Sequence, residues 1–74
     1  MLKELDTVVL TRDLPESGLT AGDVGAIVHA YPNHRAYEVE FVGLAGETIA
    51  IETLDAEAVR PVRPREIAHV RAVA

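Results

Sequence analysis

The sequence predicts an all-β fold, a small and partly open barrel of about five short strands. Several short segments alternate between apolar and polar residues, and clusters of glycine, proline and polar residues separate them. The connections are short except for the first, so the layout is compact and local. The chain has 74 residues, of which 49% are hydrophobic, and this length permits one domain with one small core.

The first predicted strand covers residues 5–11, "LDTVVLT", which is rich in Val, Thr and Leu. The next residues, "RDLPESG", are of the types that set or tolerate turns, so the chain leaves the sheet in a long irregular loop. We expect Leu14 and Leu19 to pack this loop against the core. In "GLTAGDVGAIVHAY", Gly18 and Gly22 let the loop turn, Gly25 permits a bend or bulge, and a second strand runs to residue 31.

After the turn "PNHR", the segment "AYEVEFV" alternates cleanly and predicts a third strand. A four-residue loop pairs residue 30 with 37, 28 with 39 and 26 with 41. The predicted inner face is then Ala26, Val28, Ala30, Tyr37, Val39 and Phe41. This register turns Ile27 outward beside Glu40, and a loop one residue different reverses the faces of the second strand. The register therefore stays open.

The segment "TIAIETL" predicts a fourth strand, with Ile49 and Ile51 on one side and Glu52 on the other. In "DAEAVRP", Asp55 resembles a helix N-cap and Pro61 ends the segment. One tight helical turn is therefore predicted before a short last strand at residues 59–62. Together these elements describe a barrel of the SH3 type.

The predicted barrel comprises residues 1–62, and residues 63–74 form a basic C-terminal tail. In the tail, Pro64 suits a first helical turn, and Ile67, Val70 and Val73 follow at three-residue intervals. The tail is predicted to be a short helix or an extra strand. We favour its packing on its own barrel or on a second copy over a heterologous partner.

The segments "LDTVVLTRDLPESGLTAGDVGAIVHAY", "AYEVEF" and "TLDAEAVRPV" resemble a family of small bacterial proteins catalogued as a domain of unknown function. The resemblance covers about residues 2–62. It implies an SH3-like barrel, sometimes encoded beside genes that look like toxins, and it brings no catalytic residues. To a lesser degree, "GDVGAIV" is similar to the turn and strand of KOW-type barrels in ribosomal and transcription proteins.

Charge is distributed unevenly along the chain, whose formal net charge is −5. Residues 36–59 carry six acids and no base, whereas residues 60–74 carry four arginines against one glutamate. The total argues against phosphate binding as the main activity, because that affinity depends on Lys and Arg. Docking to a basic protein surface is the functional interpretation of the acids, and ordinary solubility is the alternative. The acids of this hypothesis are Glu38, Glu40, Glu52, Asp55 and Glu57.

Other kinds of site find little support. The absence of cysteine excludes disulfides and thiolate metal sites. His29, His34 and His69 do not have the spacing of a zinc site, and His29 is predicted to face Glu38 across two strands. No nucleophile with an evident base and no phosphate-binding loop is present. We expect neither catalysis nor a cofactor or metal.

The sequence therefore predicts a cytoplasmic, non-enzymatic protein-binding module without a signal peptide or membrane span. The specific hypothesis is an antitoxin or immunity protein that occludes a basic nuclease-type toxin, with Ile67 and Val70 as apolar anchors. One alternative is a KOW-like module that binds nucleic acid through Arg60, Arg63 and Arg65. Another is a barrel that forms a homo-oligomer through the C-terminal tail.

Overall fold

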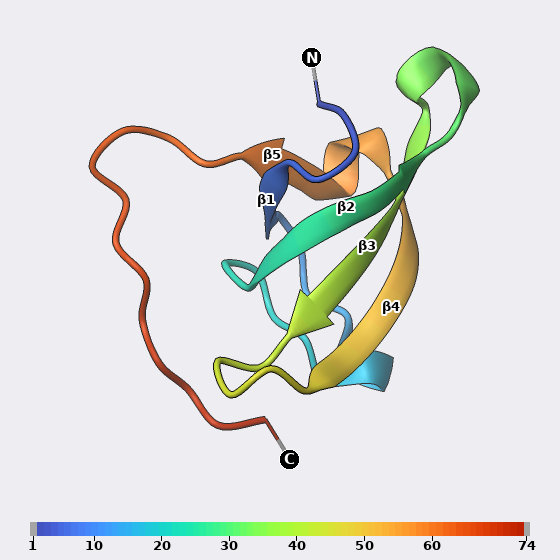
Figure 1. The fold of residues 1–74 in the computed structure, drawn as a ribbon. Helices are drawn as coiled ribbons and strands as arrows, with labels where there is room; N and C mark the ends of the chain where they lie inside the picture. The colour runs from blue at the N-terminus through green and yellow to red at the C-terminus, as the bar shows by residue number, and fades with distance from the viewer. Residues whose placement is uncertain (1, 74) are drawn as a thin grey trace.

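A computed structural model describes residues 2–73, which form one open antiparallel sheet of five strands in the order β4-β3-β2-β1-β5 (Figure 1). The strands are β1 (Thr7–Leu10), β2 (Val24–Ala30), β3 (Ala36–Val42), β4 (Thr48–Asp55) and β5 (Val59–Pro61). Three short 3-10 turns connect them, namely η1 (Pro15–Ser17), η2 (Pro32–His34) and η3 (Ala56–Ala58). The predicted all-β class, the number of strands and the helical turn before the last strand are confirmed.

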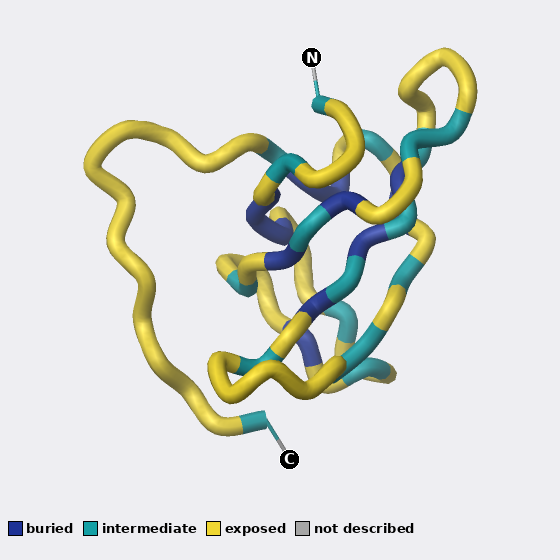
Figure 2. Tube along the Cα trace, viewed as in Figure 1, coloured by how far each residue is buried: buried dark blue, intermediate teal, exposed yellow. Residues whose placement is uncertain are grey.

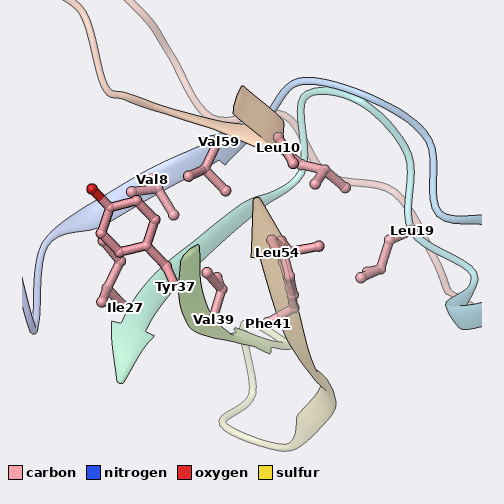
Figure 3. Packing of buried hydrophobic residues seen from close by; sticks show 10 residues of the cluster. Val8, Leu10, Leu19, Ile27, Tyr37, Val39, Phe41, Leu54 and Val59 are labelled. Atoms are coloured by element: carbon pink, nitrogen blue, oxygen red, sulfur yellow. The ribbon is translucent and has the colours of Figure 1, made fainter. Parts of the chain in front are cut away.

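The core lies on the concave side of the curled sheet, where side chains from every strand meet (Figure 3). Its buried members are Val8, Leu10, Leu19, Ile27, Tyr37, Val39, Phe41, Leu54, Ala58 and Val59. Leu14 and Leu19 form an isolated β-bridge that closes the long first loop, and Leu19 belongs to the core. These two leucines therefore pack the loop against the core as predicted.

The register between β2 and β3 differs from the predicted one by a bulge. Ala30 pairs with Tyr37 as expected, but the register then shifts, so that Ile27 pairs with Val39. Ile27 is fully buried, whereas Val28 is 41% exposed. The prediction that Val28 faces inward and Ile27 outward is therefore wrong, because the extra residue at the bulge reverses the faces of the strand beyond it.

A second irregularity between β3 and β4 changes the faces of β4. Phe41 pairs with Ala50 and Val42 with Thr48, so Ile49 is the extra residue and packs partly buried on the core. Ile51 pairs with Glu40 on the opposite, outer face of the sheet and is 55% exposed. The prediction that the two isoleucines share one side is wrong for this reason.

The glycines of the loop before β2 have distinct roles. Gly18 and Gly22 have positive φ angles of 72° and 98°, the left-handed conformation expected for turns. Gly25 lies inside β2 against Val39 and Phe41, and a Cβ there would lie only 2.7 Å from Val39 Cγ1. Gly25 therefore permits close packing, and the bulge predicted near it lies further along the strand.

The tail is neither a helix nor a strand in residues 62–73. It leaves β5, turns at Pro64 and Arg65, and arches away from the sheet before it returns (Figure 1). Almost the whole arch is exposed (Figure 2). Both predicted conformations are therefore wrong. The three-residue apolar spacing does not produce a helix because Ile67 and Val70 are largely exposed, so little burial is available to stabilise one.

Candidate protein-binding surface

Two half-buried carboxylates lie on the outer face of β3. Glu38 and Glu40 alternate with the core residues of the strand, so both point away from the core. Glu38 lies opposite His29 of β2 and Thr53 of β4, as predicted for His29. The Glu40 carboxylate accepts a hydrogen bond of 2.6 Å from the hydroxyl of Thr48. Within residues 2–73 neither glutamate takes part in a salt bridge.

A third acid, Glu4, joins this surface from outside the sheet. The amide of Leu5 donates a hydrogen bond of 2.8 Å to the carbonyl oxygen of Ile27 and ties the N-terminal segment to β2. Glu4 Oε2 then lies 3.5 Å from Nδ1 of His29, the residue opposite Glu38. Sequence reasoning missed Glu4, because it lies before the first strand and no periodicity places it. We call Glu4, Glu38 and Glu40 the acidic face.

The other predicted acids lie on β4 and η3, and they differ in which side of the sheet they face. Glu52 pairs with Val39, which places it on the core side of the sheet at the outer edge of β4, and it accepts a hydrogen bond from the hydroxyl of Ser17. Asp55 pairs with Ala36, two residues before Glu38, and therefore lies on the same outer side of the sheet as Glu38. It is 3.8 Å from a guanidinium nitrogen of Arg12 and makes no N-cap hydrogen bond. Glu57 is exposed in η3. The hypothesis groups Glu52 with Glu38 and Glu40, and this grouping is wrong because Glu52 lies on the core side of the sheet.

The basic C-terminal end is partly engaged within the chain. Both terminal nitrogens of Arg60 donate hydrogen bonds to the Glu66 carboxylate, at 3.0 and 2.6 Å, and the side chain of Arg60 is only 24% exposed. The Arg63 amide donates to the same carboxylate at 2.6 Å. These hydrogen bonds, led by those from Arg60, lower the pKa of the Glu66 carboxyl from 4.5 to about 2. The side chains of Arg63 and Arg65 extend into solvent.

A second ion pair fixes the far end of the tail. Arg71 Nε donates to Asp23 Oδ1 at 2.9 Å, and Arg71 also donates to the carbonyl oxygen of Gly18 at 3.1 Å. The hydrogen bond from Arg71 lowers the pKa of the Asp23 carboxyl below its usual value of 3.8, although partial burial acts in the opposite direction. Sequence reasoning did not find this pair, because 48 residues separate its members.

Ile67 and Val70, which the sequence analysis proposed as apolar contacts for a partner, lie between these two ion pairs and are exposed. Ile67 is 92% exposed and Val70 is 73% exposed. The structure therefore places them on the tail arch, where they are accessible, and does not place them on the acidic face.

The described residues contain no assembled metal site and no buried polar side chain. No group of three His, Cys, Asp or Glu residues within residues 2–73 is arranged to hold a metal ion. The buried set in the same range is entirely apolar. None of the helical segments described is long and apolar enough to span a membrane.

The comparisons with known proteins identify a family for the five-stranded sheet. No curated protein and no solved structure matches the chain. A family described as "Domain of unknown function (DUF4926)" matches residues 4–61, which include all five strands and exclude the tail. Because this match spans most of the chain, the protein belongs to the DUF4926 family.

Proposed function

We propose that the protein is a non-catalytic binding module and that its partner is a protein with a basic surface. The observation that carries the proposal is the pair Glu38 and Glu40, held side by side on β3 without a salt-bridge partner in residues 2–73. Glu4 extends the same negative field. A field of this kind accelerates encounter with a basic surface and selects among partners.

A nuclease-type toxin is the partner class that we propose. Such an enzyme must present basic groups to the phosphates of its substrate, so an acidic barrel can occlude it by occupying the same groups. The net charge of −5 and the resemblance to proteins encoded beside toxin-like genes support this proposal. In this role the protein acts in the cytoplasm as an antitoxin or immunity protein.

The geometry favours the acidic face over the arginine-rich end as the binding surface. A KOW-like nucleic-acid module would use Arg60, Arg63 and Arg65. Arg60 is already neutralised by Glu66, which leaves fewer free charges for phosphate contacts.

Charge reversal on the acidic face tests the proposal. Wild-type protein and an E38K/E40K variant are immobilised, and the proteins that each captures from host extract are quantified at several salt concentrations. We expect E38K/E40K to lose a basic protein that the wild type captures, with an affinity reduced about tenfold or more. An E16K/E47K variant, which makes the same charge change at exposed sites off β3, should retain it.

Two outcomes would contradict the proposal. One is equal capture of the same proteins by wild type and E38K/E40K. The other is binding of single-stranded RNA or duplex DNA at low salt that weakens when Arg63 and Arg65 are changed to Ala, which would support the nucleic-acid alternative. Circular dichroism of each variant establishes that the barrel is intact.

A further inference from the structure

The outer face of the sheet carries a hollow of about 190 Å³ over the first residues of β2. Thr7 pairs with Ala26, and Ala26 pairs with Glu40, so these three residues form one row across β1, β2 and β3. The face is hollow here because Ala26, in the middle of the row, has a short side chain between longer ones. Val24 and Val42, which are 49% and 43% exposed, also line the hollow. We call this site the outer hollow.

One charged group lies in this mainly apolar site. Among the described residues that line the outer hollow, Glu40 alone is ionisable. The hydroxyl of Thr48 donates a hydrogen bond of 2.6 Å to the Glu40 carboxylate and orients it, and no salt bridge within residues 2–73 neutralises it. Ile51 of β4 pairs with Glu40 on the same face and is 55% exposed. The outer hollow therefore presents an oriented carboxylate between exposed aliphatic side chains.

We propose that the outer hollow binds one arginine side chain of the partner protein, with the guanidinium group on Glu40 and the methylene groups against Val24 and Val42. This inference rests on the proposed function, because it takes the partner to be a protein with a basic surface. An arginine side chain matches the site in both of its parts, since an apolar stem carries a planar cation that pairs with carboxylates through two hydrogen bonds. A lysine ammonium group is more strongly hydrated and makes no such paired contact.

The surroundings of Glu40 select against other occupants. An apolar side chain in the outer hollow would bury the carboxylate without a partner, which is costly. A bare divalent cation would find a single carboxylate where it needs several oxygen ligands. A partner that covers Val42 and Ile51 also removes water from the pair between Glu40 and the arginine, which strengthens their attraction. An arginine seated in a pocket and shielded in this way is typical of the residues that dominate binding at protein interfaces.

The site is tested by NMR titration of the isotope-labelled full chain with the blocked peptide acetyl-Leu-Arg-Leu-amide. We expect the backbone amides of Ala26 and Val42 and the methyl groups of Val24 and Val42 to shift. The same peptide with lysine or with uncharged citrulline in place of arginine should bind about tenfold more weakly. Equal binding of the three peptides would overturn the proposal, because it would show that the site does not recognise the guanidinium group.

Two variants separate the carboxylate from the shape of the hollow. Glu40→Gln removes the charge but keeps an oxygen that accepts the hydrogen bond from Thr48, and it should weaken binding of the arginine peptide about tenfold or more. Ala26→Leu fills the hollow from the outer face without changing any charge and should have a similar effect. Glu38→Gln makes the same charge change two residues away, outside the hollow, and is the matched control. If Glu38→Gln weakens binding as much as Glu40→Gln does, the hollow is not the site.

The same Ala26→Leu variant distinguishes a failure of this inference from a failure of the proposed function. In the capture experiment, Ala26→Leu should lose the basic protein that the wild type captures, although its net charge is unchanged. Loss in E38K/E40K but full capture by Ala26→Leu would overturn the arginine site and leave the proposed function standing. Binding of the arginine peptide in the outer hollow of a protein that captures no basic protein would support the site and contradict the proposed function.

Discussion

Gly25 is a residue at which an added side chain would meet backbone and buried core side chains. A Cβ there would meet Val39 Cγ1 at 2.7 Å and the backbone oxygen of Glu40 at 2.9 Å, so the neighbouring strand itself would have to move. We expect Gly25→Ala to lower the free energy of unfolding by about 2 kcal/mol, the usual cost of overpacking. Urea denaturation measures this loss.

Gly22 provides the comparison for this prediction. Nothing lies within 4 Å of a Cβ at Gly22, and only its φ of 98° opposes a side chain. Gly22→Ala should cost about 1 kcal/mol from backbone strain alone. If the two substitutions cost the same, close packing at Gly25 is not what requires glycine.

The attachment of the tail through Glu66 should depend on pH. The pKa of the Glu66 carboxyl is lowered from 4.5 to about 2, chiefly by hydrogen bonds from Arg60, so the carboxylate binds its proton less readily when the tail is anchored. Anchoring therefore contributes stability fully above the ordinary pKa of 4.5 and loses it as pH falls towards 2. NMR titration of the Glu66 carboxyl should show the low pKa, and Arg60→Gln should return it towards 4.5. An unchanged pKa in that variant would contradict the assignment.

At the scale of elements, the bulge in β2 gives two neighbouring residues very different burial. Ile27 is fully buried and Val28 is 41% exposed. We expect Ile27→Ala to cost about 3 kcal/mol of unfolding free energy, through lost burial and the cavity left behind. Val28→Ala should cost less than about 1 kcal/mol. Chemical denaturation measures the free energy of unfolding of both variants. A larger loss for Val28→Ala than for Ile27→Ala would contradict the bulge and support the register predicted from the sequence.

The sequence predicted the positions of the strands better than it predicted which side of the sheet each residue faces. Alternation in residues 36–42 gave β3 its bounds and orientation, because that strand runs without interruption. In β2 and β4, one extra residue reverses the alternation, and consecutive apolar residues such as Ile27 and Val28 satisfy either pattern. The pairing with β3 decides between these patterns, and it involves residues distant in the chain.

The candidate site, like the fold, was predictable only where a strand runs without interruption. Glu38 and Glu40 follow from the alternation of β3, whereas Glu52 changes face with the irregularity in β4. Glu4 and the Arg71–Asp23 pair depend on chain segments that meet only in the folded state. The tail was misassigned because apolar spacing predicts a face only when another surface covers it.

At the scale of the whole molecule, the sheet builds its core without the tail. None of the core residues comes from residues 62–73, and the family match ends at residue 61. We expect a protein truncated after Val62 to unfold cooperatively, with a melting temperature within about 4 °C of the full chain. Thermal denaturation measures this. A truncated protein that lacks a cooperative transition would show that the tail is required for folding.

The position of Glu52 also affects whether strands of other chains can add to the edge of the sheet. β4 is an edge strand, and its unpaired backbone groups can recruit another strand. A carboxylate on the core side of that edge hinders such addition, because the arriving strand would bury the charge. Glu52→Val would leave four consecutive apolar residues at positions 49–52, and we expect faster fibril formation by thioflavin fluorescence. Glu47→Val, outside the strand, should not accelerate fibril formation. This pair of results would show that one inward-facing charge, at Glu52, protects the edge from aggregation.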